Sequence, residues 1–193
     1  MKKEIFLVTS NARKVEDYNR RIDNGEYIVK NVALDLNEGR SMDILEIAKL
    51  KLLQAKELFP GKRIIVEDRG FFIPALNGFP GPFVKLFLNT IGIDGLLKLM
   101  AGEDNREASL ITVLGYYDGQ DDHFFYDDEK GFITKEKRGD NIRGWTDILY
   151  IYGYQTFPGL SMAELNDEQW AEHIRITESC DFIEKFKMFL EGC

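Results

Sequence analysis

The chain has few cysteines and lacks a long hydrophobic run. Its two cysteines, Cys180 and Cys193, lie near the C-terminus without the partner spacing of a zinc site. This cysteine usage suits a reducing compartment. The apolar run at residues 5–8 is too short for the core of a signal peptide, and no stretch approaches the length of a membrane span. We therefore expect a soluble, cytoplasmic protein without a membrane partner.

Positive charge is also scarce, because 25 lysines and arginines face 33 aspartates and glutamates, giving a formal net charge of -8. This balance argues against a non-specific partner among nucleic acid polymers, since duplex affinity rests largely on cations that neutralise phosphates. A phosphate ligand would need a local cluster of basic side chains. With 193 residues and 44% hydrophobic content, the chain is long enough for one substantial core, and we expect a single α/β domain over residues 1–193.

Two adjacent carboxylates follow an apolar run typical of a strand. Residues 63–66 (RIIV) predict the strand, and Glu67 and Asp68 come directly after it. A loop rich in Gly and Pro then leads to a helix that carries Lys85. Adjacent carboxylates at a strand end commonly hold Mg²⁺, which takes a few carboxylate oxygens together with waters and substrate phosphates. The alternative is a strand that ends in a solvated acidic turn.

A capped helix is expected after the first strand, Glu4–Thr9. Ser10 or Asn11 is a good N-cap, so the first N–H groups of the helix point at whatever lies above the strand end. Lys14 falls in the first turn, where a cation is unfavourable for the helix dipole unless an anion is nearby. The pattern outlines an anion site, although a capped helix with exposed basic residues is the favoured explanation when this pattern is taken alone.

A lysine interrupts the apolar stripe of the next expected helix. After a strand over residues 27–34 and a polar loop over 35–41, this helix begins near Met42 and ends at a Pro-Gly pair. Lys51 falls in the middle of its apolar face. Its ammonium group must extend to solvent, find a carboxylate or reach into a polar cavity.

The second half of the chain is rich in β-type patterns and closes with a helix. Asp118 and Gly119 indicate a turn between two strands. We expect helices that begin at Pro82 and span 93–100 and 182–190, and strands over 106–117, 123–126, 131–137 and 144–150.

A series of short motifs resembles the inosine triphosphate pyrophosphatase family. Residues 9–14 (TSNARK) are similar to its T-G/S-N-x-x-K signature. Residues 35–38 (DLNE), 46–51 (EIAKLK), 67–70 (EDRG) and 76–85 (LNGFPGPFVK) then follow in family order. The last segment is the most specific, and its position just after the acid pair argues against a chance match.

The resemblance implies an elongated α/β fold, in which a long mixed β-sheet is flanked by helices and two lobes surround a nucleotide cleft. It also implies a homodimer and the Mg²⁺-dependent hydrolysis of a small-molecule nucleoside triphosphate to the monophosphate and pyrophosphate. Glu38 resembles the family's metal ligand, and Asp68 resembles the residue that helps to hold the metal and activates water. Glu67 supports that acidic pair.

The remaining matched residues correspond to groups that face the triphosphate. Attack on the α-phosphorus develops charge on its oxygens and on the departing pyrophosphate, so Mg²⁺ and lysines are the natural stabilisers. The phosphate-facing lysines correspond to Lys14, Lys51 and Lys85, and the loop that cradles the triphosphate corresponds to Thr9, Ser10 and Asn11.

Three departures from the family pattern lie where base identity or local charge is set. Arg69 replaces a small hydroxyl residue, and would add a bidentate phosphate contact or crowd out a metal-bound water. In residues 144–148, Trp145 is retained for base stacking, while the aspartate, Asp147, is displaced and a proline is lost. The family's S-H-R triplet is matched by EHIR, in which His173 and Arg175 would donate to the 6-keto oxygen of the base. On a strand these two side chains would point to opposite faces, and on a helix they would diverge by about 200°.

Three interpretations therefore stay open. The first is removal of deaminated purine triphosphates such as ITP, dITP and XTP from the nucleotide pool. The second keeps the chemistry but moves it to another modified or standard nucleotide, as the altered base-recognition segments allow. The third is a nucleotide-binding or structural protein that has lost turnover, which Arg69 would explain.

Overall fold

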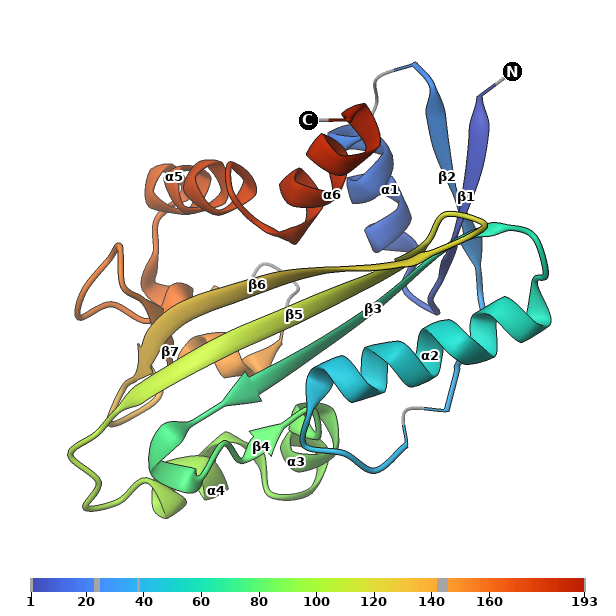
Figure 1. Ribbon diagram of the computed structural model, residues 1–193. Helices are drawn as coiled ribbons and strands as arrows, with labels where there is room; N and C mark the ends of the chain where they lie inside the picture. The colour runs from blue at the N-terminus through green and yellow to red at the C-terminus, as the bar shows by residue number, and fades with distance from the viewer. Residues whose placement is uncertain (1, 23–24, 38, 142–145, 193) are drawn as a thin grey trace. The chain divides into compact units, whose positions relative to one another are not determined.

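A mixed sheet flanked by helices forms the framework of the protein (Figure 1). The computed structural model describes residues 2–22, 25–37, 39–141 and 146–192. Within these ranges the sheet has seven strands in the order β2-β1-β3-β5-β6-β7, with β4 paired to β3. The elements, with 3-10 helices written η, are β1 (Lys3–Val8), α1 (Ala12–Arg21), β2 (Tyr27–Val32), α2 (Ile44–Leu58), β3 (Arg63–Phe72), η1 (Pro74–Leu76), β4 (Pro80–Gly81), α3 (Val84–Thr90), α4 (Gly92–Leu99), β5 (Glu107–Tyr117), β6 (Asp122–Ile133), η2 (Asp147–Tyr150), β7 (Tyr152–Tyr154), η3 (Met162–Glu164), α5 (Asp167–Glu178) and α6 (Phe182–Glu191).

The chain divides into two compact units, each with its own core. The first comprises residues 1–68, 112–127 and 178–193, and the second comprises 69–111 and 128–177. No helix in the described part of the chain is long and apolar enough to span a membrane.

Parallel strands order the first unit. β1 pairs with β2 along one edge and with β3 along the other, both in parallel. Successive strand residues point to opposite faces, so Ile65 packs with α1 and α6, whereas Ile64 and Val66 pack with α2. The two terminal helices therefore cover one face of these strands, and α2 covers the other (Figure 1).

The second unit is built around aromatic and branched side chains. Phe71 meets Tyr152 edge to face, with ring centroids 5.5 Å apart. A Cβ on Gly131 would lie 2.2 Å from the carbonyl oxygen of Gly153, so glycine allows β6 and β7 to approach closely. The buried core residues here are Phe71, Ile73, Phe87, Ile93, Leu96, Met100, Ala108, Ile133, Ile148, Leu149, Ile151, Tyr152, Met162 and Leu165.

Several expected strand boundaries are wrong. β3 continues to Phe72 because Phe71 and Phe72 pair with β4, so Glu67 and Asp68 lie within a strand and not at its end. The expected strand at 131–137 is partly the end of β6, which runs without interruption from residue 122 to 133.

The expected strand over 144–150 is a 3-10 helix in its described part, η2. Ile148 and Leu149 are both buried. A tight helical turn can bury neighbouring side chains together, whereas a half-exposed strand points them to opposite faces.

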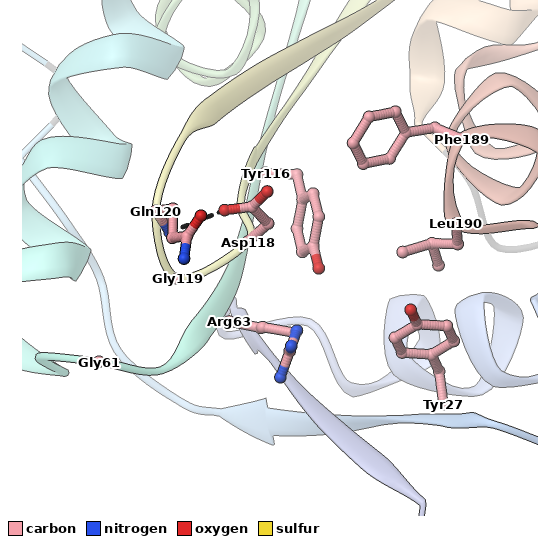
Figure 2. Close-up of a pocket in the computed structure, with 9 residues that line it drawn as sticks. All are labelled: Tyr27, Gly61, Arg63, Tyr116, Asp118, Gly119, Gln120, Phe189 and Leu190. Atoms are coloured by element: carbon pink, nitrogen blue, oxygen red, sulfur yellow. Dashed lines mark hydrogen bonds between the residues drawn. The ribbon is translucent and has the colours of Figure 1, made fainter. Parts of the chain in front are cut away.

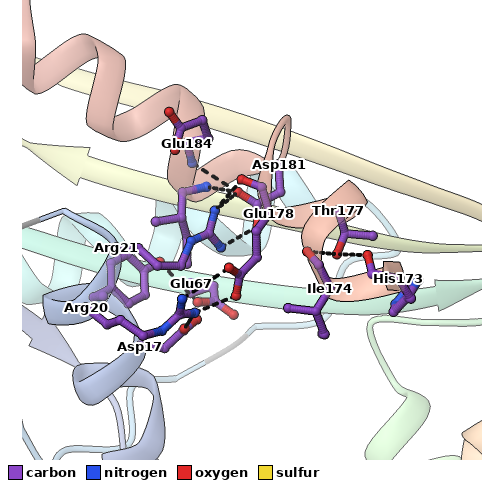
Figure 3. A network of polar contacts seen from close by, with 12 residues as sticks. Asp17, Arg20, Arg21, Glu67, His173, Ile174, Thr177, Glu178, Asp181 and Glu184 are labelled. Atoms are coloured by element: carbon purple, nitrogen blue, oxygen red, sulfur yellow. Dashed lines mark hydrogen bonds and ion pairs between the residues drawn. The ribbon is translucent and has the colours of Figure 1, made fainter. Parts of the chain in front are cut away.

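A buried ion pair ties α1 to the start of α6 (Figure 3). Arg21 holds Asp181 with Nη1–Oδ2 and Nη2–Oδ1 distances of 2.5 and 2.6 Å, and their side chains are 6% and 10% exposed. Asp181 also caps α6, because its Oδ1 accepts hydrogen bonds from the N–H groups of Ile183 and Glu184. The neighbouring Arg20 pairs with Glu178, but its side chain is 57% exposed.

We predict that Arg21→Met destabilises the protein far more than Arg20→Gln. The first change leaves a buried carboxylate without its cation, at a cost of about 3–5 kcal/mol. The second removes an exposed pair worth about 0–1 kcal/mol. Urea denaturation of the two variants beside the wild type measures both costs, and equal losses would show that burial does not set the strength of the Arg21 pair.

Candidate active site

The order of the strands reverses between β1 and β3, although both strands run in the same direction. The chain leaves β1 through α1 to reach β2 on one side, and then crosses by α2 to β3 on the other side. The two helices lie on opposite faces. In open α/β sheets, ligands bind outside the carboxyl ends of strands at such a reversal. Leu7 pairs with Ile65, so the residues just after β1 come level with Glu67.

Side chains of the loop after β1 accept hydrogen bonds from backbone N–H groups at the N-terminus of α1. The Oγ1 of Thr9 accepts a hydrogen bond from the N–H of Asn11 at 3.1 Å, and the Oδ1 of Asn11 accepts one from the N–H of Arg13 at 3.1 Å. Ser10 and Asn11 are exposed. The first turn of α1 has no acidic residue and includes Lys14. A helix N-terminus with basic side chains at the carboxyl edge of a sheet is suited to an anion.

Glu67 faces α1. Its Oε1 lies 2.9 Å from the Nζ of Lys14, and its Oε2 accepts a hydrogen bond from the hydroxyl of Tyr18 at 3.1 Å. The Glu67 side chain is 5% exposed, whereas that of Lys14 is 33% exposed. Burial, with a further contribution from the Glu67 charge, raises the pKa of Tyr18 well above its usual value, so the phenol remains a donor. Lys14 is therefore held at the surface by a buried carboxylate.

Asp68 faces the opposite side and meets α2. Its Oδ1 lies 2.5 Å from the Nζ of Lys51, and both side chains are 11% exposed. Lys51 could have extended to solvent, found a carboxylate or reached into a polar cavity. In the structure it has a carboxylate partner. A buried pair of this kind is strongly held because either charge alone would be costly in the interior.

The acid pair is therefore divided between two faces, because consecutive residues of a strand alternate. Glu67 and Asp68 each have a lysine from the helix that covers their own face. No group of three or more His, Cys, Asp and Glu side chains suited to a metal ion forms among the described residues. The third predicted ligand, Glu38, lies outside the described residues.

The other predicted contacts to phosphate and base lie in the second unit. Arg69 is half-buried in β3, Lys85 is exposed in the first turn of α3, and Asp147 is exposed at the start of η2. Trp145 lies outside the described residues. The roles of these residues stay predictions.

α5 separates His173 from Arg175. His173 is 5% exposed and packs against the rings of Tyr154 and Trp170, with centroid distances of 4.7 and 5.7 Å. Burial lowers its pKa to about 4, and its Nδ1 has no hydrogen-bond partner among the described groups. Arg175 is exposed and pairs with Glu172 at 2.6 Å. The helical divergence expected for this pair is confirmed, and a shared contact with the base stays a prediction.

Tyr18 is the residue of this site that the sequence analysis did not identify as functional. The sequence did contain one indication of its role. Tyr18 follows Lys14 by four residues, so the two side chains share one face of α1. The sequence offers no comparable sign that Glu67 is its acceptor, since the strand and helix are 49 residues apart.

Comparison with known proteins identifies close sequence relatives. The sequence model of the Ham1 family matches residues 5–171. A dITP/XTP pyrophosphatase from Methanopyrus kandleri is 34% identical over 184 residues, which cover 95% of this chain and 94% of the relative. An inosine triphosphate pyrophosphatase from Kluyveromyces lactis is 34% identical over 152 residues, which cover 77% and 78% of the two chains.

Solved structures share the fold. The Ham1 protein of Staphylococcus aureus matches with a TM-score of 0.81 and 26% identity, over 98% of this chain and 99% of that chain. A HAM1 protein from Coxiella burnetii matches with a TM-score of 0.83 and 21% identity, over 99% and 100% of the two chains. The expected fold class, a mixed sheet flanked by helices, is confirmed.

We predict that His173 makes stability depend on pH. Its folded-state pKa of about 4 lies below the usual value of 6.5, so the unfolded chain binds more protons between these values. The stability conferred by a neutral His173 is present above about pH 6.5 and falls, by up to about 3 kcal/mol, as the pH drops towards 4. Urea denaturation of the wild type and His173→Asn across this window checks the difference in slope.

A matched control replaces the other histidine. His123→Gln keeps His173 and should retain the wild-type loss of stability on acidification. If the free energy of unfolding depended on pH to the same extent in the wild type and in His173→Asn, burial of a neutral imidazole would be contradicted.

Proposed function

The chain belongs to the Ham1 family, and on that premise we propose that it is a nucleoside triphosphate pyrophosphatase. It hydrolyses deaminated purine triphosphates such as ITP, dITP and XTP to the monophosphate and pyrophosphate. Relatives that align over most of this chain are named dITP/XTP pyrophosphatase and inosine triphosphate pyrophosphatase, which supports the reaction and the substrate class. The expected resemblance to the inosine triphosphate pyrophosphatase family is confirmed.

One structural observation carries the proposal. Two lysine–carboxylate pairs, Lys14 with Glu67 and Lys51 with Asp68, lie beside the carboxyl end of β1 at the reversal of the sheet. A triphosphate bound at this edge offers negative oxygens that compete with the carboxylates for the lysine ammonium groups. The protein as a whole is acidic, so local cations are what would attract such a ligand.

The predicted site residues that lie in the first unit each have a role in this proposal. The loop over Thr9, Ser10 and Asn11 and the N-terminus of α1 bind phosphate oxygens, together with Lys14 and Lys51. Asp68 accepts the proton of the water that attacks the α-phosphorus, and Lys51 fixes the orientation of its carboxylate. Glu67 positions Lys14 and acts through it.

The carboxylates also suit a magnesium ion. Mg²⁺ takes one or two protein carboxylates and completes its shell with waters and phosphates. Asp68 and Glu38 supply oxygen donors of the right chemistry. Glu67, the third carboxylate of the predicted set, already holds Lys14 and Tyr18. A bound ion would neutralise phosphate charge and lower the pKa of a coordinated water.

The second unit supplies the remaining proposed contacts. Lys85 and Arg69 bind phosphate oxygens, Trp145 stacks on the base, and Asp147, His173 and Arg175 set base preference. At neutral pH the lowered pKa of His173 keeps its ring uncharged, so it offers one N–H donor and one acceptor nitrogen. A homodimer and a cytoplasmic location complete the proposal. The homodimer rests on the family resemblance alone, and the location rests on the cysteine usage.

A different nucleotide is the second candidate, and the geometry of α5 favours it over loss of activity. His173 and Arg175 point to different sides of the helix, so a shared grip on a 6-keto oxygen would need a rearrangement. Such a change would alter base preference and leave the lysine–carboxylate pairs intact.

A panel of nucleoside triphosphates with Mg²⁺ separates these candidates. We predict that kcat/KM for ITP, dITP or XTP exceeds that for ATP and GTP by at least about tenfold, because hydrogen bonds to a base edge discriminate strongly. Pyrophosphate release is the measurement. A preference for another base would support the second candidate, and binding of all nucleotides without turnover would contradict the proposed activity.

The neighbouring carboxylates predict a separation of kinetic effects. Asp68→Asn removes the proton acceptor but preserves shape, so kcat should fall by about 10²–10⁴-fold while nucleotide binding persists. Glu67→Gln is the matched variant, because it neutralises the adjacent acid on the other face and loosens Lys14. It should raise KM about threefold to tenfold with little effect on kcat. Steady-state kinetics and direct binding measure both variants, and a comparable loss of kcat in both would contradict the assignment.

A further inference from the structure

A pocket lies at the start of β3, away from the candidate active site (Figure 2). Its volume is about 510 Å³, and its walls come from the starts of β2 and β3, the β5–β6 turn and the last turn of α6, all within the first unit. Arg63 is the first residue of β3, and Glu67 lies four residues further along the strand. At the usual rise per residue, the backbones of these two residues are about 13 Å apart. The pocket is therefore separate from the candidate active site.

Arg63 places a cation in this pocket, and no ion pair links it to a carboxylate among the residues that the structure describes. The guanidinium is half-buried and shares a side-chain hydrogen bond with Tyr116. No acidic side chain of the described residues pairs with it within ion-pair distance. A guanidinium has several N–H donors in a planar fork that matches phosphate and carboxylate oxygens.

The nearby carboxylate, Asp118, is engaged by its own turn. Its Oδ1 accepts the N–H groups of Gln120 and Asp121 at 2.7 and 2.8 Å, and its Oδ2 lies 3.1 Å from the Nε2 of His123. These contacts fix the β5–β6 turn as one wall of the pocket (Figure 2). They orient the Asp118 carboxylate towards its own turn and His123, and the structure gives it no ion pair with Arg63.

The opposite wall is aromatic and apolar. Phe189, whose ring lies 6.1 Å from that of Tyr116, is 38% exposed although it belongs to a core-facing helix. Tyr27 and Leu190 line the same side, and Figure 2 shows their side chains directed into the space beside Arg63. An accessible aromatic ring across the pocket from a guanidinium suits a flat ligand with an anionic end.

We propose that this pocket binds a small organic anion of the nucleoside monophosphate type, with its phosphate on Arg63 and its base against Phe189 and Tyr27. The volume suits a ligand larger than a simple aromatic acid. The turn at Gly119 and Gln120 supplies polar groups for a sugar. The product of the proposed reaction has this chemistry, but the site stands without that activity because it shares no residue with the candidate active site.

Nuclear magnetic resonance titration with inosine monophosphate, without metal, tests the site directly. The backbone amides of Gly61 and Gly119 report on the pocket, and those of Lys14 and Asp68 report on the candidate active site. Saturable shifts of Gly61 and Gly119 are expected. Because binding and not turnover is measured, a failure here is distinguishable from a failure of the proposed function. Shifts confined to Lys14 and Asp68 would overturn the second site and leave the first intact.

Variants assign the anion contact. Arg63→Gln should weaken inosine monophosphate at the pocket by about tenfold or more. Lys62→Gln is the matched control, because it removes the adjacent cation, which lies over Phe6 and outside the pocket, and should change affinity less than about twofold. Equal effects of the two variants would overturn a specific contact to Arg63.

The body of the ligand is tested separately, which also covers the case in which Arg63→Gln does not fold. Phe189→Ala should weaken inosine monophosphate at the pocket by about threefold to tenfold and leave inorganic phosphate unchanged. In the wild type, inosine and inorganic phosphate should each bind there more weakly than inosine monophosphate. If inosine bound as tightly as inosine monophosphate, the requirement for an anion would be overturned. If inorganic phosphate bound as tightly as inosine monophosphate, the role of the base would be overturned.

Discussion

The alternation of side chains along β3 is the constraint on which the proposed site depends. Glu67 and Asp68 are neighbours in the sequence, so they must face opposite sides of the strand. Each is largely buried and needs a cation close by. α1 supplies Lys14 on one face and α2 supplies Lys51 on the other. The lysines therefore reach the carboxyl end of β1 from two directions, which one helix could not achieve.

The parallel order β2-β1-β3 makes this arrangement possible. Because the strand order reverses beside β1, α1 and α2 cover opposite faces of the sheet. The loop that begins at Thr9 follows the carboxyl end of β1 and leads into α1. Carboxylates hold both lysines in fixed positions. In the proposed function, a triphosphate would replace part of that interaction with its own charge, so the ion pairs would orient the cations for phosphate. Tyr18 and the buried Arg21–Asp181 pair fix α1 at its middle and at its end.

Much of this framework could be predicted from the sequence, and the misses have physical causes. The caps of α1, the stripe of α2 and the need of Lys51 for a polar partner follow from local pattern. The length of β3 does not, because its last residues are held by β4, a pairing that adds Phe71 and Phe72 to the strand. The identity of each partner also depends on tertiary contacts, as with Tyr18 and Glu67. The order of the motifs indicated the family correctly. The burial of His173 could not be predicted from a motif, because it depends on tertiary contacts with Tyr154 and Trp170.

The central claim is that Lys14 and Lys51 hold one triphosphate from opposite faces of β3. A crystal structure of the protein with Mg²⁺ and a non-hydrolysable inosine triphosphate analogue is its most direct test. The account predicts phosphate oxygens within hydrogen-bond distance of both Nζ atoms, with the Asp68 carboxylate beside the α-phosphorus. A triphosphate that touches neither lysine, with both ion pairs unchanged, would contradict it.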